Sequence, residues 1–559
     1  MKKTLLFIGI TLISVLTFGQ SQRLVVAEEF TSATCGPCAS QNPAFDALLQ
    51  QNAGIITSIK YHMSWPMPGN DPMYLQNPED NNARRSYYGV NSVPHVFLDG
   101  NYFSGMPVQV TQNTINSAAA IPSPFEMQVQ HRLSPNHDSI YVTTLIKATD
   151  NVSGDLVAHV VVIEKHIHFN SPPGTNGERD FYNVMKKMLP DKNGTSIHST
   201  FTSGDYVILQ NSWLLANVYD TSQLAVVSFV QNDFNKNIHQ GALSSTDPIT
   251  PPYANDAEIL NVGNVTSKNC SGKIHPYVTI RNNGSNTLTS LHIEYSVNEG
   301  ETFTYDWTGS LDFLETDVID LGEIQFTVAD TNSLVVNGLN PNGIGDDYTP
   351  NNELYYTFYR APVLSGTVNM FMILDDHPEE TTWQLKNSSG EIIQEGGPYS
   401  NPGAMVIEPL NITQNDCYEV IVRDAGGNGM CCDFGNGYYA VIYGNNQTAF
   451  EGSTFDSLQR NELSYDVVGM NEFKAYSNVN IGPNPSTGIF NVNFILQKDV
   501  NVSLAVYDFL GKELVTVDKG FQNRGEKRWK VDVSALGRGI YLFEMKLGDE
   551  TFVKKIAVE

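Results

Sequence analysis

Four proline-rich or polar stretches divide the chain, and they limit what it can fold into more than any other feature. They lie at Ser117–Pro124, Thr246–Asn255, Arg360–Gly366 and Gly469–Gly488. A chain of 559 residues is also too long for one hydrophobic core, since single cores stop growing near about 250–300 residues. We therefore expect five small domains separated by these breaks.

The parts differ in their secondary-structure pattern. Residues 20–116 mix a strand (LVVAEEF), a helical run (AFDALLQQN) and a second strand (HVFLDG), which is typical of an α/β fold. The later parts show short strand-like runs between Gly, Asn and Pro, which predict all-β sandwiches. We expect a β-sandwich at 117–246, an immunoglobulin-like domain at 256–360, a cysteine-containing sandwich at 365–466 and a further β domain at 478–559.

Residues 1–19 are typical of a secretory signal peptide. Lys2 and Lys3 precede an apolar run from Leu5 to Phe18, and a small residue follows at Gly19. The run is shorter than the roughly 20 residues of a membrane span. We therefore expect a mature chain without a transmembrane segment, in a compartment where disulfides persist. The net charge of −27 would repel phosphate backbones, which argues against nucleic acid as a partner.

Cys35 and Cys38 form a Cys-Gly-Pro-Cys motif at a predicted strand-to-helix junction. Unpaired backbone N–H groups and the helix dipole stabilise a thiolate there, so the pKa of Cys35 should fall. Cys35 would attack a substrate disulfide, and Cys38 would resolve the mixed disulfide. A structural disulfide is the alternative, and metal binding would need a second pair of ligands.

The residues around this pair resemble the thioredoxin superfamily. The matching features are an acidic residue and Phe at Glu29 and Phe30, the Cys35–Cys38 motif, Pro43 inside the following helix, and Val93-Pro94 before the strand HVFLDG. The resemblance implies a thioredoxin-like domain at 20–116 with thiol-disulfide oxidoreductase activity toward protein thiols and disulfides. It requires no bound cofactor.

The same resemblance assigns roles to single residues. Glu29 would help to take the proton from Cys38, and Val93 and Pro94 would contact the substrate backbone across a cis bond. Thr34 stands where the family commonly has Trp, which leaves the substrate preference open.

The chain between Cys38 and Pro94 is longer than in a minimal thioredoxin, and we expect the extra residues in His62–Arg85, near the site.

The order of domains over residues 23–245 resembles the outer membrane protein 28 family. In that order a thioredoxin-like domain is followed by a sandwich that contains VVVIEKHIHFNSPPGTNG and VMKKMLP. That resemblance implies architecture more than mechanism.

The fourth part contains acidic and Asn/Gly-rich loops. Asp375, Asp424 and Asn428 offer hard oxygens that can hold calcium, although the spacing is not that of an EF-hand. Plain turns with solvated carboxylates are the alternative. His166 and His168 would share one face of a strand, an arrangement that can ligate metal, but no third ligand is evident and packed or surface histidines are the alternative reading.

The remaining cysteines leave their pairing open. Cys417 is expected to bond Cys431 or Cys432, because adjacent cysteines rarely bond each other, and Cys270 would take the third thiol or stay free.

The last part resembles the type A C-terminal sorting domain of the type IX secretion system. The matching segments are PNPSTGIF from Pro483, VYDFLGKEL, LGRGIY from Leu536 and the closing KKIAV. The resemblance implies the secretion machinery as a partner, export across the outer membrane to the cell surface or medium, and attachment to surface polysaccharide. A domain of this kind directs export, and it does not indicate what reaction the protein catalyses.

These observations predict an exported multidomain protein that carries a thioredoxin-like oxidoreductase. The competing prediction is a non-enzymatic surface protein for binding or adhesion, in which the dithiol is structural or vestigial. The extent of predicted β-sandwich favours that alternative.

Overall fold

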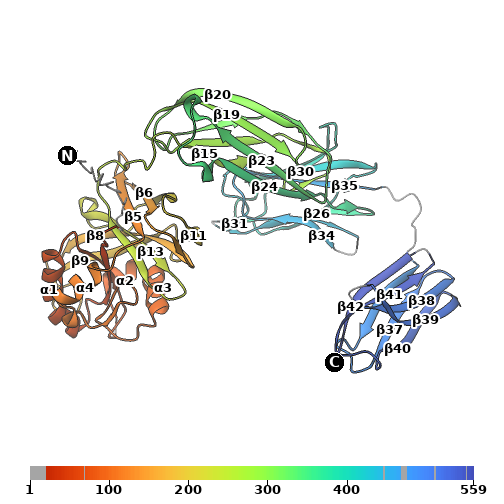
Figure 1. Cartoon of the computed structure of the whole chain (residues 1–559), viewed down its shortest axis with the longest axis horizontal. Coiled ribbons are helices and arrows are strands. Elements are labelled where there is room, and N and C mark those ends of the chain that lie inside the picture. Colours follow the sequence, from red (N-terminus) through yellow and green to blue (C-terminus); the bar gives the residue numbers. More distant parts are fainter. Residues whose placement is uncertain are drawn as a thin grey trace, which may run out of the picture. The chain divides into compact units, whose positions relative to one another are not determined.

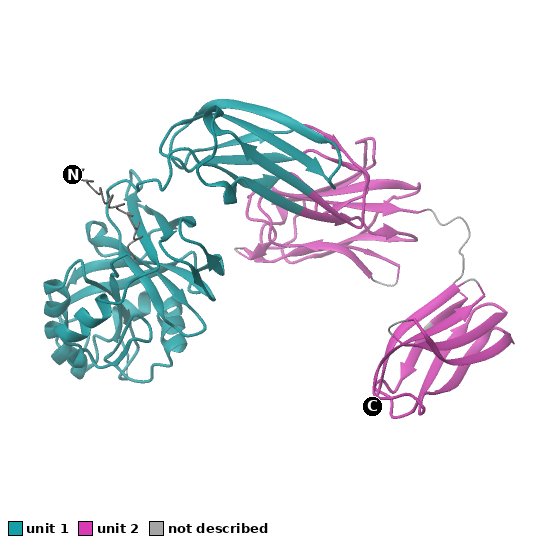
Figure 2. Cartoon of the chain, viewed as in Figure 1, with its two compact units in different colours: residues 1–263, 276–321, 334–356 teal, residues 264–275, 322–333, 357–559 magenta. Residues whose placement is uncertain are grey.

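The computed structural model describes residues 21–67, 69–432, 434–444, 447–466, 475–508, 511–548 and 550–559. The predicted signal peptide, residues 1–19, lies outside them. A mixed α/β part comes first and β-sandwiches follow, as predicted (Figure 1). By their contacts the residues form two compact units (Figure 2): residues 1–263, 276–321 and 334–356, and residues 264–275, 322–333 and 357–559.

A nine-stranded sheet includes β1, the strand that leads into the Cys35–Cys38 motif. Its main strands are β1 (Val25–Thr31), β2 (Ile56–His62), β3 (His95–Leu98), β4 (Phe103–Gly105), β8 (Leu156–His168), β9 (Asp180–Leu189), β13 (Leu224–Asn232) and β14 (Ile238–Leu243). They lie in the order β14-β13-β8-β9-β2-β1-β3-β4, and the two-residue β10 (Thr195–Ser196) pairs with β8. β1 and β2 are parallel, and β3 is antiparallel to β1.

Helices connect the strands of the N-terminal part. They are α1 (Gly36–Gln51), α2 (Pro72–Gln76), α3 (Pro78–Tyr88) and α4 (Gln112–Ala119). Each begins where the sequence offers a cap: Asp71 and Asn77 accept backbone N–H groups ahead of prolines that occupy the first turns of α2 and α3.

The expected boundary at residue 117 does not separate two sheets. β2 pairs with β9 in parallel through Lys60 and Val184, so strands from both sides of residue 117 share one sheet. The boundary proposed from composition therefore marks a connection, while the hydrogen-bonded sheet continues across it.

β8 shows how the two parts are joined. Val160 and Val162 pack into one core, with residues of the three-stranded sheet β12-β6-β5, and Val161 and Ile163 pack into another, with Phe30. A strand that is buried on both faces reads as a continuous apolar run. The strands of the smaller sheet are β5 (Phe125–Leu133), β6 (Ser139–Ala148) and β12 (Tyr206–Leu214).

The third part contains antiparallel strands. β15 (Ala257–Gly263), β18 (Tyr277–Asn282) and β21 (Thr316–Asp320) form one sheet. β19 (Leu288–Val297) pairs with β20 (Thr302–Leu311) and with β23 (Thr331–Leu339). By their contacts, the segments 264–275 and 322–333 belong to the second unit.

Two further sandwiches follow, each with its own core. The fourth part pairs the sheets β25-β35-β30-β27-β28 and β29-β26-β33-β34, in which β25 is the two-residue strand Val363–Leu364. Its longer strands are β26 (Val368–Ile373), β27 (Thr381–Lys386), β28 (Ile392–Gly396), β29 (Met405–Pro409), β30 (Asp416–Asp424), β33 (Tyr438–Tyr443), β34 (Gln447–Gly452) and β35 (Leu458–Tyr465).

The C-terminal part has the sheets β36-β37-β40 and β39-β38-β41-β42. Its strands are β36 (Tyr476–Gly482), β37 (Ile489–Leu496), β38 (Val500–Tyr507), β39 (Glu513–Gln522), β40 (Gly525–Asp532), β41 (Gly539–Leu547) and β42 (Glu550–Val558).

Candidate functional site

Cys35 and Cys38 form a disulfide at the N-terminus of α1. Cys35 is the N-cap residue, and its Sγ accepts a hydrogen bond of 3.1 Å from the backbone N–H of Cys38. The same N–H, together with the helix dipole, would stabilise a thiolate at Cys35 after reduction. Only 2% of Cys35 and none of Cys38 is exposed, so Cys35 lies nearer the surface.

The Val93–Pro94 bond is cis, which confirms the expected geometry of this loop. The carbonyl oxygen of Val93 lies 3.6 Å from Cys35 Sγ. The loop therefore faces the sulfur that would meet a substrate. The contact of Val93 and Pro94 with a substrate backbone stays a prediction.

Thr34 links the site to the longer connection between Cys38 and Pro94. Its hydroxyl donates to the carbonyl oxygen of Trp65 at 3.0 Å and lies 2.9 Å from the hydroxyl of Ser32. The segment His62–Arg85 therefore reaches the dithiol turn, as expected. Thr34 itself is only 6% exposed, so little of its side chain faces solvent.

Glu29 is fully buried and belongs to a charged cluster formed by β1, β2 and α1. It pairs in register with Lys60, whose Nζ lies 3.1 Å from Glu29 Oε2 and 2.5 Å from Asp46 Oδ1. Burial raises the pKa of Glu29, and the lysine only partly offsets this. Burial lowers the pKa of Lys60, but the attraction of the two carboxylates outweighs it and the net shift is upward. A carboxyl with a raised pKa is suited to exchanging a proton with a thiol, and the exchange between Glu29 and Cys38 stays a prediction.

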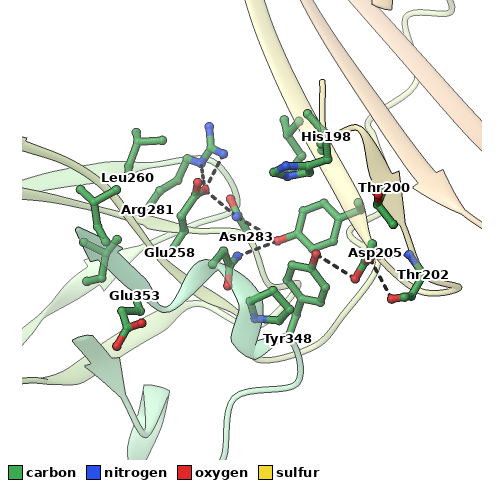
Figure 3. Close-up of a pocket in the computed structure, with 17 residues that line it drawn as sticks. His198, Thr200, Thr202, Asp205, Glu258, Leu260, Arg281, Asn283, Tyr348 and Glu353 are labelled. Atoms are coloured by element: carbon green, nitrogen blue, oxygen red, sulfur yellow. Dashed lines mark hydrogen bonds and ion pairs between the residues drawn. The ribbon is translucent and has the colours of Figure 1, made fainter. Parts of the chain in front are cut away.

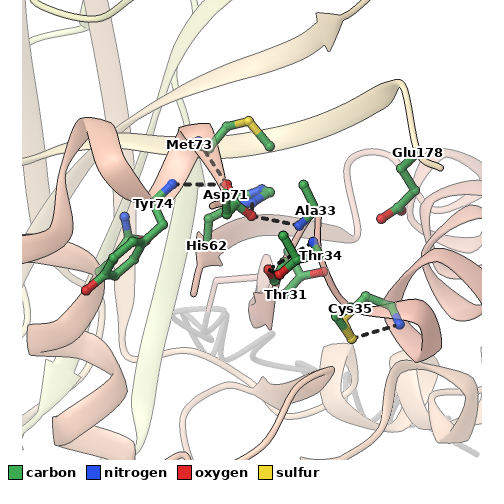
Figure 4. Close-up of polar contacts among 12 residues, drawn as sticks. Thr31, Ala33, Thr34, Cys35, His62, Asp71, Met73, Tyr74 and Glu178 are labelled. Carbon is green, nitrogen blue, oxygen red and sulfur yellow. Dashed lines mark hydrogen bonds and ion pairs between the residues drawn. A yellow bond between two sulfur atoms is a disulfide. The ribbon is translucent and has the colours of Figure 1, made fainter. Parts of the chain in front are cut away.

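A second buried pair, His62 and Asp71, supports the turn that precedes Cys35 (Figure 4). Asp71 Oδ2 lies 2.7 Å from His62 Nδ1 and accepts the backbone N–H of Ala33 at 2.7 Å. Burial raises the pKa of Asp71, but the contacts with His62 and the backbone donors lower the pKa by more than burial raises it. The net shift of the pKa is therefore downward. Neither residue was predicted as part of the site. An Asp before a Pro is typical of a helix start, but the bond of Asp71 to Ala33 depends on tertiary structure.

The loop between β8 and β9, residues 169–179, packs against the same turn. The Asn176 side chain donates to the carbonyl oxygens of Ser32 at 3.1 Å and Cys35 at 3.2 Å. A β-carbon on Gly174 would lie 2.1 Å from the carbonyl oxygen of Ala33, so the close approach of this loop requires glycine. Residues from the second predicted domain therefore complete the dithiol site.

Glu178 closes this contact from the same loop. Its Oε1 accepts from Asn42 Nδ2 at 2.9 Å, and its Oε2 accepts from Asn176 Nδ2. Asn42 lies on α1, one turn after Cys38, and also donates to Thr31 Oγ1 at 3.1 Å. Gly, Pro and Asn are typical of a loop, but no local signal in the sequence indicates what this loop contacts.

His166 and His168 share one strand face, as expected, and both contact Asp180. His166 Nε2 and His168 Nδ1 lie 2.9 and 2.8 Å from Asp180 Oδ1. These hydrogen bonds lower the pKa of Asp180. The pair therefore joins the ends of β8 and β9, at the base of the loop that covers the dithiol turn.

The expected pairing of the other cysteines is wrong. Cys270 bonds Cys417, with a Cα–Cα distance of 5.6 Å, and Cys431 bonds Cys432. The segment that carries Cys270 is held near Cys417 by Glu462, which accepts the backbone N–H of Cys270 at 2.7 Å. The pairing spans 147 residues of sequence, and it depends on long-range contacts that no local pattern reveals.

The three residues expected to hold calcium lie at or just after the ends of β26 and β30 in the fourth part. Asp375 and Asp424 are buried, and Asp424 Oδ2 accepts the backbone N–H groups of Asn428 and Gly429 at 2.9 and 3.1 Å. Burial raises the pKa of Asp375, and the charge of Asp424 adds to the shift. Asn428 Oδ1 is buried without a donor. These oxygens are of the type that calcium prefers, and the metal stays a prediction.

A cavity of about 630 Å³ lies in the first unit, where β12 meets the third part (Figure 3). Tyr206 donates to Asp256 Oδ2 at 2.7 Å and accepts from the amides of Asn283 and Asn351 at 2.9 and 3.1 Å. Burial raises the pKa of Asp256 to about 7. The Oδ1 atoms of both asparagines are buried without a donor. No pattern in the sequence indicated this cavity.

Residues 480–559 match the family model of the secretion system C-terminal sorting domain. This tail is a sorting domain. The match covers the strands from the end of β36 to β42 and confirms the predicted sorting domain. The protein is therefore exported across the outer membrane to the cell surface. No curated protein matches the chain.

Several solved structures match parts of the chain at low sequence identity and low TM-score. HBP35 of Porphyromonas gingivalis is 14% identical with a TM-score of 0.35, and the match covers 61% of this chain and 99% of that one. Dimeric latent PorU from Porphyromonas gingivalis is 10% identical with a TM-score of 0.15, covering 86% and 37%. The CARDB domain of the PF1109 protein from Pyrococcus furiosus is 18% identical with a TM-score of 0.17, covering 21% and 95%.

No helix within the described residues is long and apolar enough to cross a membrane.

Proposed function

We propose that the N-terminal part of this exported protein is a thiol-disulfide oxidoreductase that acts on protein thiols and disulfides. The observation that carries the proposal is the position of Cys35: it caps α1, accepts the N–H of Cys38 and faces the cis Val93–Pro94 loop. A disulfide that only stapled a loop would not need this combination of helix terminus, buried acid and cis-proline loop.

The exchange conserves electrons and protons as follows. The reduced Cys35 thiolate attacks one sulfur of a substrate disulfide, a mixed disulfide forms, and the other substrate sulfur leaves as a thiolate. Glu29 takes the proton of Cys38, whose thiolate then attacks Cys35 Sγ and breaks the mixed disulfide. The second substrate sulfur leaves as a thiolate, and Glu29 returns the proton to it. The substrate gains two electrons, and Cys35 and Cys38 end as a disulfide. An external dithiol must reduce this pair again, and the reverse sequence oxidises a substrate dithiol.

A redox titration of Cys35 and Cys38 against glutathione tests the proposal. We expect the pair to exchange reversibly with the buffer, with the oxidised and reduced forms both populated within the accessible range. A pair that stays oxidised throughout, in protein whose N-terminal part is folded, would be a permanent staple and would rule the proposal out.

The second candidate function is ligand binding by the β-sandwich parts, and the cavity beside Tyr206 favours it. Two buried amide oxygens without donors, from Asn283 and Asn351, offer acceptors to a ligand that carries hydroxyl groups. Tyr348 adds an aromatic wall. The chemistry suits a neutral saccharide, whose hydroxyls donate to such acceptors and whose apolar face contacts aromatic rings.

Saturation-transfer NMR with neutral oligosaccharides of glucose, galactose and N-acetylglucosamine tests this second candidate. We expect transfer to at least one sugar, and a loss of most of it in Tyr348→Ala. Tyr305→Ala, which removes an exposed tyrosine outside the cavity lining, should leave the transfer unchanged. No transfer to any sugar, or equal transfer in both variants, would contradict it.

We also propose calcium binding by the loops around Asp375, Asp424 and Asn428. Calcium would neutralise two buried carboxylates, so the thermal midpoint of the fourth part should rise by several degrees with added calcium and fall with chelator. Asp424→Asn should remove the response, whereas Asp416→Asn, which changes a mostly backbone-bonded carboxylate at the start of β30, should retain it. An unchanged midpoint in the wild-type protein would exclude calcium binding.

For the sorting domain, we propose that export is followed by removal of the tail and attachment to surface polysaccharide. The match at residues 480–559 supports this proposal. Mass spectrometry of the cell-surface form would test it, since the mature chain should end before β36 and carry a glycan.

A further inference from the structure

The loop between β8 and β9 carries a carboxylate, Glu178, that the proposed mechanism does not use and that is linked to the dithiol turn through Asn176. Glu178 is half-buried, and each of its oxygens accepts from an asparagine side chain. An ionised carboxylate accepts hydrogen bonds at both oxygens and donates none, which is the pattern of bonds at Glu178. Burial raises its pKa, and the bonds from Asn42 and Asn176 oppose that shift.

The two asparagines connect this charge to both ends of the dithiol turn. Asn176 donates to the carbonyl oxygen of Cys35, and Asn42 lies on α1 one turn after Cys38. Glu178 therefore lies beside the first turns of the helix whose N-terminus stabilises a thiolate. A negative charge at this place opposes that stabilisation.

We propose that Glu178 is a positioning residue that holds the β8–β9 loop on the Cys35 turn and limits thiolate formation in the reduced dithiol. The inference rests on the proposed redox function of Cys35 and Cys38. By making the thiolate less favourable, Glu178 makes the oxidised pair a weaker oxidant, because a stabilised thiolate is what favours the reduced form of a strong oxidant.

Other charged groups interact electrostatically with Glu178. They are Glu29 on β1, whose pKa is raised in part by Glu178, Lys60 and His62 on β2, and Asp46 on α1, which contacts Lys60. These side chains are present in every variant below, so a difference between variants reports Glu178 together with its effect on the pKa of Glu29.

The test is the pH dependence of alkylation of the reduced full-length protein by iodoacetamide, with Cys35 followed by mass spectrometry. In Glu178→Gln the midpoint should fall by about 0.5 pH unit or more, which corresponds to roughly threefold faster alkylation below the midpoint. Asn176→Ala keeps the charge, and its midpoint should not fall as far. Glu79→Gln, which changes an exposed carboxylate bound to Lys192, serves as the control and should match the wild type.

An unchanged or higher midpoint in Glu178→Gln would overturn the inference. If that variant does not fold, Gly174→Ala provides a second route, because the added β-carbon must push the loop away from Ala33 and should lower the midpoint in the same direction. Alkylation needs no disulfide substrate. A protein that shows the shift but does not exchange with glutathione would therefore refute the proposed function and leave the role of Glu178 intact.

Discussion

Replacing Cys35 by serine should abolish disulfide exchange. The expected result is a loss of all turnover in an assay that follows the reduction of insulin disulfides with dithiothreitol as electron source, because the hydroxyl of serine is not ionised at neutral pH and cannot form a disulfide. Cys35 is the sulfur that caps α1 and faces the Val93–Pro94 loop, so no other thiol in the site can take its place.

Cys38→Ser separates the two sulfurs. This variant retains the nucleophile but cannot resolve the mixed disulfide, so a covalent complex with the substrate should accumulate and be visible on a non-reducing gel. Cys270→Ser, which breaks a disulfide in the other unit, is the matched control and should leave turnover unchanged. Equal activity of wild type and Cys35→Ser would show that the measured exchange comes from elsewhere.

Arg84→Met should cause the largest loss of stability in the N-terminal part. Arg84 is 2% exposed and donates to both carboxylate oxygens of Glu28 at 2.7 and 2.8 Å, and Tyr61 donates to the same carboxylate at 3.0 Å. Removing the guanidinium leaves a buried carboxylate unpaired, which costs about 3–5 kcal/mol. Urea unfolding of the variant should show a loss of this size.

The double variant Arg84→Met with Glu28→Gln tests the cause. Because the glutamine carries no charge, the double variant should recover a large part of the lost free energy of unfolding. Arg132→Met is the control. Its guanidinium is exposed and lies over the ring of Tyr141, so the change should stay within about 0.5 kcal/mol. A double variant that is less stable than Arg84→Met would contradict this explanation.

The parts of the site that local sequence could predict are those encoded within a few residues. The strand before Cys35, the helix that starts at Gly36 and the cis bond at Val93–Pro94 depend on motif spacing and were predicted. The sorting domain was recognisable for the same reason, since its motifs recur at fixed positions.

The parts that could not be predicted depend on contacts between distant segments. Asn176 reaches the carbonyl oxygen of Cys35 from 141 residues away, and Asp71 bonds to Ala33 across 38 residues. The sharing of one sheet across residue 117 also escaped prediction, because an apolar strand that serves two cores has the same pattern as a strand buried within one sandwich.

This shared sheet determines which fragment of the chain can be expressed, or transferred by gene fusion, with the dithiol site intact. A fragment that ended at residue 116 would expose the edge of β2 that pairs with β9, and would lose Val161, Ile163 and Phe229 from the core around Phe30. It would also lack the loop that contacts Cys35. The smallest portable unit with this chemistry therefore extends to about β14, and a gene fusion that moved only the Cys-Gly-Pro-Cys half would transfer the motif without its supporting structure.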